Sequence, residues 1–95
     1  MILPTICMNG SSPEEMEIIY RAMMMSVKEA RLELNKYYPH GRDYQLAPEG
    51  AYEQARFEHR ARIVVLESVE KELREIALHC HAQKIERKKK MSNGS

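Results

Sequence analysis

The sequence predicts an all-α protein, an antiparallel helical hairpin with an extended N-terminal arm. Four glycines and four prolines in 95 residues are too few turn residues for an all-β fold. Apolar residues recur at intervals of three and four along two long stretches, which is the spacing of one helix face. Because 95 residues make a small protein, we expect a single domain over residues 1–95.

The first twelve residues predict an extended arm that ends in a helix cap. Residues 1–10 are mostly apolar and close on Asn-Gly, and they are too few to form a sheet alone. Ser12 suits the N-cap, Pro13 suits the first helical position, and Glu15 completes a capping box. The first helix should therefore begin at Pro13.

The first helix is predicted over residues 13–38. Its main apolar stripe consists of Met16, Tyr20, Met23, Val27, Ala30, Leu34 and Tyr37. A second apolar line, spaced by seven residues, consists of Ile18, Met25 and Leu32. Together they make the helix apolar over more surface than one neighbouring helix covers. Pro39 disfavours helical backbone at Tyr38 and ends the helix there.

A loop over residues 39–47, a second helix over 48–88 and a flexible tail over 89–95 complete the predicted hairpin. Pro48 suits the first turn of a helix, although Gly50 weakens that turn. Residues at intervals of three and four form the seam that should face the first helix. They are Tyr52, Ala55, His59, Arg62, Leu66, Val69, Leu73, Ile76, Cys80 and Gln83. The tail should fray.

Two helices alone bury little apolar surface per residue. We therefore expect the hairpin to assemble with copies of itself into a helical-bundle homo-oligomer. The second apolar line of the first helix is the predicted contact between copies. A glutamate in place of Met25 would bury a charge in that contact, which is costly unless the charge is paired.

The charge balance limits the classes of function. Fifteen Lys and Arg against fourteen Asp and Glu leave a net charge of +1, without the excess typical of nucleic-acid binders. No stretch is apolar enough to span a membrane and no export signal is present, so we expect a cytoplasmic protein. Cys7 and Cys80 should be free thiols in a reducing compartment. No metal is expected, because neighbours such as Cys80 and His81 point in different directions on a helix.

Polar residues interrupt the seam of the second helix at His59 and Arg62, where leucine would fit. Glu58 lies close on the same face through the i+4 spacing to Arg62. One interpretation is that these residues are solvated or paired with glutamate. The other is a polar pocket at the loop end of the hairpin, where Arg62 would clamp a phosphate or carboxylate with its planar fork. The sequence leaves both open.

The connecting loop should bring further polar residues to the same end. The residues expected to converge there are His40, Arg42, Tyr44, His59, Arg60 and Arg62, and Tyr37, Tyr38 and Tyr52 belong to the same region. Arginine charge suits phosphate and aromatic rings suit a base, which is the chemistry of a nucleotide site. The alternative is a loop held by hydrogen bonds of Asp43, with the tyrosines packing the hairpin.

A third candidate anion site lies at the start of the first helix, where Asn9, Ser11 and Ser12 surround a glycine. Backbone N–H groups at a helix N-terminus attract anions. The helix between this cap and the loop would be roughly 37 Å long, at about 1.5 Å per residue. The two ends would therefore meet only across a subunit boundary.

The motifs resemble those of a family of short, uncharacterised phage and prophage proteins. The matching segments are Asn9-Gly10-Ser11-Ser12, Pro39-His40-Gly41-Arg42-Asp43-Tyr44, and Glu58-His59 with Arg62. The resemblance covers about residues 7–80 and departs from the family pattern at Ser11, where threonine is usual, and at Gln45, where a second tyrosine is usual. It implies a biological setting in a phage-infected cell and no mechanism.

We expect a binding protein rather than an enzyme. No nucleophile motif, metal-ligand spacing or phosphate loop is present, and no cofactor is implied. The leading hypothesis is a small phage-type protein that sequesters an anionic, nucleotide-like ligand in the host cytoplasm and so counters host defence.

Two other classes of function stay open. A helical protein-interaction module would occupy a host protein through the methionines at positions 23–25, since methionine surfaces adapt to partners. A DNA-binding accessory protein would use Arg56, Arg60, Arg62 and the basic tail, but glutamates interleave with the arginines, which disfavours nucleic acid as a partner.

Overall fold

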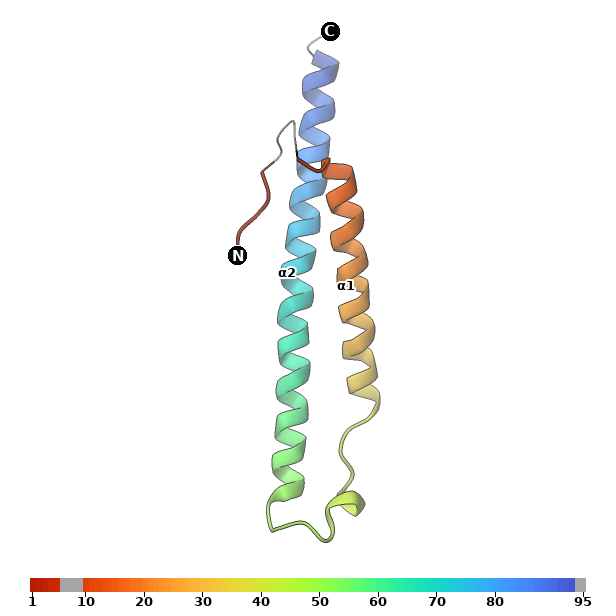
Figure 1. Ribbon diagram of the computed structural model, residues 1–95, viewed down its shortest axis with the longest axis vertical. Helices are drawn as coiled ribbons and strands as arrows, with labels where there is room; N and C mark the ends of the chain where they lie inside the picture. Colours follow the sequence, from red (N-terminus) through yellow and green to blue (C-terminus); the bar gives the residue numbers. More distant parts are fainter. Residues whose placement is uncertain (6–9, 94–95) are drawn as a thin grey trace.

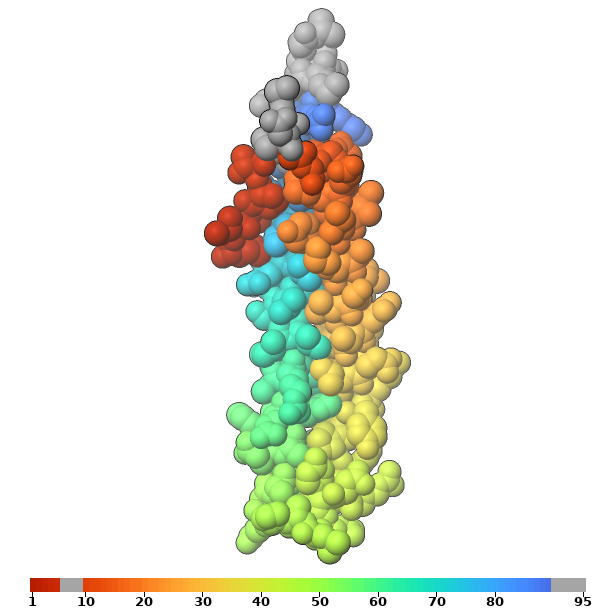
Figure 2. All heavy atoms as spheres, in the orientation of Figure 1, coloured from red at the N-terminus to blue at the C-terminus, as the bar shows by residue number. Residues whose placement is uncertain are grey.

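The computed structural model describes the backbone of residues 1–5 and 10–93, and side chains as far as Lys89. It is an antiparallel hairpin of two helices that lie side by side (Figure 1). Its elements are helix α1 (Pro13–Lys36), a 3-10 turn η1 (Gly41–Tyr44) and helix α2 (Ala51–Asn93). Figure 2 shows the resulting narrow rod, which measures 73 × 21 × 18 Å. The predicted all-α hairpin is confirmed.

The predicted start of α1 is also confirmed. The Ser12 hydroxyl accepts a hydrogen bond from the Glu15 amide at 3.1 Å, and the Ser12 carbonyl accepts one from the Met16 amide at 3.0 Å. Pro13 occupies the first helical position. Glu14 and Glu15 place negative charge in the first turn, where the helix dipole favours it.

The end of α1 differs from the prediction by two residues. The helix ends at Lys36 rather than at Tyr38, and Tyr37 forms the C-cap with extended backbone. Tyr38 stays out of the helix because Pro39 follows it, and the cap residue before Tyr38 is then only half helical. The prediction ended the helix at Tyr38, the residue that Pro39 restricts, and did not allow for a cap residue before it.

The start of α2 also differs, since it lies at Ala51 rather than at Pro48. Gly50 has a φ angle of 84°, in the left-handed region that favours glycine, so the chain cannot be helical through this position. The Gly50 carbonyl accepts the first bond of the helix, from the Gln54 amide at 3.0 Å. The turn before it is closed by a bond of 3.1 Å from the Ala51 amide to the Pro48 carbonyl.

The predicted end of the second helix at residue 88 lies five residues before the end that the structure gives. Helix α2 continues to Asn93, beyond the start of α1, whereas residues 94–95 lie outside the described residues (Figure 1). Lysine and arginine are good helix formers, and positive charge near a helix C-terminus is favoured by the dipole. These effects favour helical backbone through the basic run.

Few apolar side chains are buried between the helices. Ile63 is fully buried, and Ala77 and Cys80 are buried fourteen and seventeen residues further along the same helix. Burial raises the pKa of the Cys80 thiol. In contrast, sixteen large apolar side chains of the described residues are exposed. The hairpin by itself therefore leaves much of its apolar surface in water.

Charged residues supply much of the contact between the helices. Glu70 is buried and accepts hydrogen bonds from Arg31 on α1, at 2.7 Å, and from Arg74 on its own helix, at 3.4 Å. The bond from Arg31 is the main cause that lowers the pKa of Glu70. This ion pair ties the C-terminal part of α1 to the middle of α2 in one register.

A second charged cluster ties the helices near the start of α1. The buried carboxylate of Glu17 lies 3.0 Å from the Nδ1 atom of His81 and 3.2 Å from the Nζ atom of Lys84, both on α2. Arg21, one turn along α1, adds a contact of 2.9 Å. The hydrogen bond from His81, followed by those from Lys84 and Arg21, lowers the pKa of Glu17 to about 2.

This shift predicts a loss of stability in acid. The pKa of Glu17 is about 2 in the folded chain and 4.5 in the reference state, so its contribution is complete above pH 4.5 and is lost as the pH falls towards 2. Melting temperatures measured from pH 6 to about pH 2 should therefore fall less steeply for Glu17→Gln than for the natural chain. The matched control is Glu33→Gln, which removes an exposed pair with Lys36 on the same helix. Equal slopes for Glu17→Gln and the natural chain would contradict the assignment.

The N-terminal arm is held against the second helix. Residues 1–5 lie beside α2 (Figure 1), where the Nε2 atom of His79 donates to the Pro4 carbonyl at 2.9 Å. Over the part of the chain that the structure describes, neither helix combines the length and the apolar character needed to cross a membrane.

Candidate functional site

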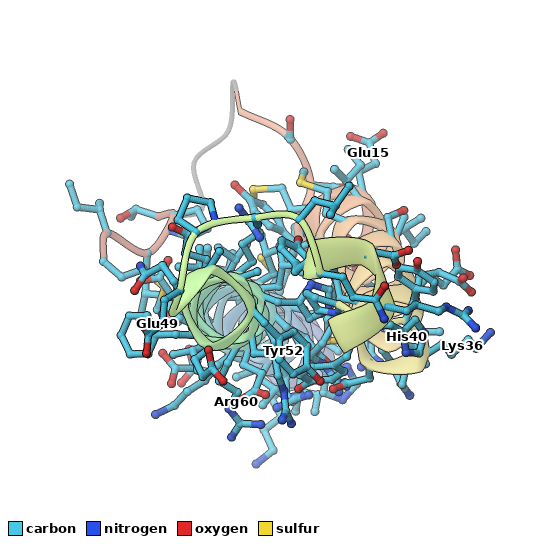
Figure 3. All side chains as sticks on the ribbon, turned by 90° about the horizontal axis from the view of Figure 1, so that it is seen from below. Glu15, Lys36, His40, Glu49, Tyr52 and Arg60 are labelled. Carbon is cyan, nitrogen blue, oxygen red and sulfur yellow. The ribbon has the colours of Figure 1, made fainter. Side chains whose placement is uncertain are left out.

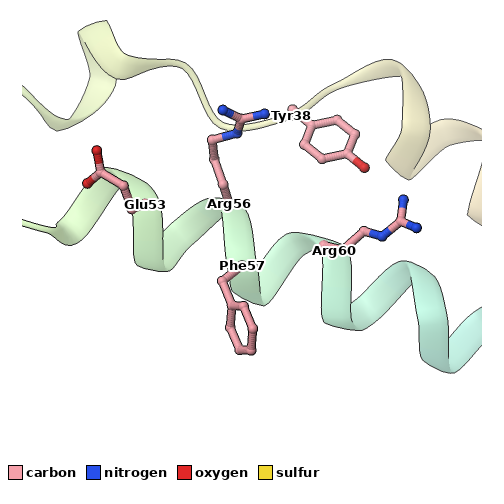
Figure 4. A pocket seen from close by; sticks show the side chains of 5 residues that line it. All are labelled: Tyr38, Glu53, Arg56, Phe57 and Arg60. Atoms are coloured by element: carbon pink, nitrogen blue, oxygen red, sulfur yellow. The ribbon is translucent and has the colours of Figure 1, made fainter.

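A groove with arginine and aromatic side chains in its lining lies at the loop end of the hairpin. It has a volume of about 550 Å³ and is lined by Tyr38, Glu53, Arg56, Phe57 and Arg60; we call it the loop-end groove (Figure 4). The four lining residues of α2 share one side of the helix, because they are spaced by three, four and seven residues. In Figure 4 the side chains of Arg56 and Arg60 reach up towards the segment that carries Tyr38, whereas Phe57 points away from that segment.

A buried histidine positions Tyr38. The His59 ring is only 9% exposed, and its Nε2 atom donates to the Leu34 carbonyl at 2.6 Å. That carbonyl belongs to the last turn of α1, where carbonyls have no partner within the helix. The Tyr38 ring packs on the His59 ring with centroids 4.6 Å apart. His59 therefore completes the end of α1 and gives the tyrosine a fixed support.

Aromatic rings gather below this groove. The Tyr52 and Tyr44 rings lie 6.1 Å apart, and the guanidinium carbon of Arg56 lies 5.8 Å from the Tyr52 ring centre, within the range of a cation–π contact. Gly41 sits against the same ring, since a side chain added there would lie 3.7 Å from Tyr52. Figure 3 looks onto this end and shows Tyr52 beside α2, with His40 on the side of α1.

The arginines at the loop end differ from the others. Five arginines of the described residues lie within 4.0 Å of a carboxylate, namely Arg21, Arg31, Arg62, Arg74 and Arg87. No such carboxylate is found among the described residues for the remaining three, which are Arg42, Arg56 and Arg60. All three belong to the loop or to the first turns of α2. Glu53 is the one acidic residue that lines the groove.

The structure divides the residues that the sequence expected to converge. His40, Arg42 and Tyr44 lie in the loop at this end, as expected. His59 is at the same end but is buried in the contact between the helices. Arg62 lies on the other side of α2, 3.9 Å from Glu58, which matches the intramolecular interpretation of that residue.

The third predicted site lies at the other end of the rod. The Ser12 hydroxyl is used to cap α1, and Ser11 is exposed beside it. Asn9 lies outside the described residues. Within one chain the length of α1 separates this cap from the loop, so the structure does not bring the two predicted sites together.

Sequence reasoning underrated Arg56 and Tyr38. Arg56 and Arg60 are four residues apart, which places them on one side of a helix, and this signal was readable. Tyr38 precedes a proline and therefore leaves the helix early. The direction in which its ring turns depends on His59, and that contact becomes visible only when the two helices are placed together.

A second groove, here called the apolar groove, lies on the opposite side of α2. It has a volume of about 450 Å³ and is lined by Leu34, Ala61, Arg62, Val65 and Leu66. Four of these five residues are apolar. It therefore suits apolar side chains rather than a charged ligand.

The consecutive residues His79, Cys80 and His81 do not form a metal site. His79 bonds to Pro4, His81 bonds to Glu17, and Cys80 is buried. Nowhere in the described residues do three side chains of the metal-binding types come together.

The chain matches no known family, no curated protein and no solved structure.

Proposed function

We propose that the protein binds an anionic, nucleotide-like ligand in the loop-end groove. One observation carries this proposal: the three arginines without a carboxylate partner among the described residues all lie at this end of the rod. Two of them, Arg56 and Arg60, line the groove together with Tyr38. Cations that no carboxylate neutralises favour an anion from outside the chain.

The groove contains suitable groups for both parts of a nucleotide, the phosphate and the base. The guanidinium groups of Arg56 and Arg60 can each bind phosphate oxygens through two parallel hydrogen bonds. The rings of Tyr38 and Tyr52 offer faces for stacking a base. Because His59 fixes the Tyr38 ring before any ligand arrives, less conformational freedom is lost on binding.

The loop residues predicted from the sequence extend the proposed site. Tyr44 lies beside Tyr52, Arg42 belongs to the same short turn η1, and His40 lies next to the Tyr37 ring, with ring centres 5.3 Å apart. Together with the resemblance to phage proteins, this favours sequestration of a host signalling nucleotide, which counters host defence by removing the free ligand. We propose binding without turnover, with the host cytoplasm as the location.

Removing the two arginines should abolish this binding. A hydrogen bond to a charged group contributes about 1.5–3 kcal/mol, so the double variant Arg56→Gln, Arg60→Gln should bind at least about 100-fold more weakly. Titration calorimetry against linear and cyclic nucleotides measures the loss. Inorganic phosphate and adenosine, tested separately, should each bind more weakly than AMP, because each fills only part of the groove.

Arg62→Gln is the matched control. Arg62 is on the same helix two residues from Arg60, but it faces the other groove and pairs with Glu58. We expect this variant to keep the affinity of the natural chain. An equal loss in the control, or no heat with any nucleotide at millimolar concentration, would contradict the proposal.

A protein-interaction module is the second candidate. The observation in its favour is the excess of exposed over buried apolar side chains among the described residues. In this case the natural chain would show no nucleotide binding. Substitutions on an apolar surface, rather than in the loop-end groove, would abolish its binding to the partner protein.

A further inference from the structure

One side of the hairpin is apolar on both helices. The apolar groove joins Leu34 of α1 to Ala61, Val65 and Leu66 of α2, so these residues share this side. Helix periodicity extends the surface along α1, since Met23, Val27 and Ala30 precede Leu34 by eleven, seven and four residues. It extends along α2 as well, because Val69 and Ile76 follow Val65 by four and eleven residues, and the charged residues on this part of the surface are Arg62 and Glu72. We call this surface the apolar face.

The contact between the helices does not cover the apolar face. Met23 is 41% exposed, Val65 is 60% exposed and Val69 is also exposed. Part of the reason is that the helices meet partly through polar groups, with Glu17 and Glu70 buried where α1 touches α2. The main apolar stripe of α1 therefore does not point directly at α2. Part of it, such as Met23, is exposed to solvent.

We propose that the apolar face binds the same face of a second copy of this chain, giving a four-helix bundle. The face is two helices wide and follows the length of α1, so another hairpin matches its shape. A surface that pairs with itself generates a closed dimer with two-fold symmetry. The partner supplies the apolar contacts that the small core of one chain lacks.

The area of the apolar face is close to the area that a stable dimer buries. The 24 residues of α1 span roughly 36 Å, and two adjacent helices are roughly 20 Å wide. The face therefore measures roughly 700 Å² on each copy, close to the approximately 800 Å² per partner of a stable protein interface. A single partner helix would cover only about half of it. Methionine side chains such as Met23 adapt to an irregular opposing surface.

The proposal replaces the contact predicted from the line Ile18, Met25 and Leu32. Met25 is nine residues from Leu34, which places it on the opposite side of α1 from the apolar groove. That line is also narrow, because the exposed cations Arg21 and Lys28 border it. Two methionines separated by one residue thus belong to different surfaces.

This difference gives a matched pair of variants. Met23→Glu places a charge in the apolar face, and Met25→Glu places the same charge on the other side of the same helix at similar exposure. Sedimentation equilibrium at micromolar to millimolar concentration should give the natural chain twice its 11.1 kDa mass. We expect Met25→Glu to keep that mass and Met23→Glu to sediment as a monomer.

Val65→Glu tests the same face from α2. It should also sediment as a monomer, with helix content checked by circular dichroism. If a variant loses helix as well, the natural chain provides the second measurement, since the melting temperature of a dimer rises with protein concentration. A monomeric natural chain with a concentration-independent melting temperature would overturn the proposal. Dissociation by Met25→Glu alone would overturn it too.

The result is independent of the proposed ligand. The loop-end groove and the apolar groove lie on different sides of α2. The variant Arg56→Gln, Arg60→Gln should therefore keep the assembled mass, whereas Met23→Glu should change it.

Discussion

Replacing Ile63 by alanine is expected to lower the free energy of unfolding by about 2–5 kcal/mol. Ile63 is 0% exposed and is the largest apolar side chain buried completely between the two helices. The substitution removes apolar surface from the core and leaves a cavity that two long helices cannot easily close. Small domains have a total stability of only about 5–15 kcal/mol, so this loss is a large fraction of the whole.

Val64→Ala is the control for that substitution. Val64 is the next residue along α2 and is half exposed, so its truncation should change stability by less than about 1 kcal/mol. Urea unfolding followed by circular dichroism compares the two variants. The protein concentration must be the same in each experiment, because self-association would add to the apparent stability. Equal effects at the two positions would show that the packing between the helices differs from the one described.

The parts of the fold that were predicted correctly depend on local interactions. The cap of α1 involves Ser12, Pro13 and Glu15, which lie within four residues of one another, so their roles are visible in the sequence. The start of α2 was missed although the signal was present. The sequence pattern places Gly50 inside the helix as a residue that weakens its first turn, whereas its left-handed backbone ends the loop and places the first helical turn after it.

The orientation of the helices about their axes was not predictable from periodicity. The apolar stripe of α1 suggested that Met23 would face α2, whereas Met23 is exposed and Glu17 is buried in the contact. A glutamate at such a position becomes favourable only when His81 and Lys84 lie opposite, sixty-four and sixty-seven positions later in the chain. Stripe counting cannot detect pairs that distant.

The candidate site was predictable as a region and not as a set of residues. The break in the seam at His59 was a correct sign of special chemistry, and the structure uses it to close the end of α1 on the Leu34 carbonyl. Choosing between Arg60 and Arg62 required the rotation of α2 against α1, because the two residues face different grooves. That rotation is set by tertiary contacts such as Glu70 with Arg31.

The ion pair of Glu70 with Arg31 gives the second large expected effect on stability. Glu70→Gln should lower the free energy of unfolding by about 1.5–3 kcal/mol, the contribution of hydrogen bonds to a charged group. The Arg31 guanidinium, with only 21% of its side chain exposed, would keep its charge and lose its main partner. Equilibrium urea unfolding at neutral pH measures the effect. The exposed pair of Lys36 with Glu33 is the comparison, and Glu33→Gln should cost less than about 1 kcal/mol.

The double variant Arg31→Met, Glu70→Leu separates two roles of the pair. Buried ion pairs replaced by apolar residues of similar volume are often neutral or stabilising, so the double variant should recover most of the loss seen with Glu70→Gln. If stability recovers but sedimentation shows mixed assemblies, the ion pair serves to fix the rotation and register of the two helices. If stability stays as low as in the single variant, the contact between Arg31 and Glu70 contributes more than an apolar replacement does. In that case the pair, and not the small apolar core, determines how the hairpin closes.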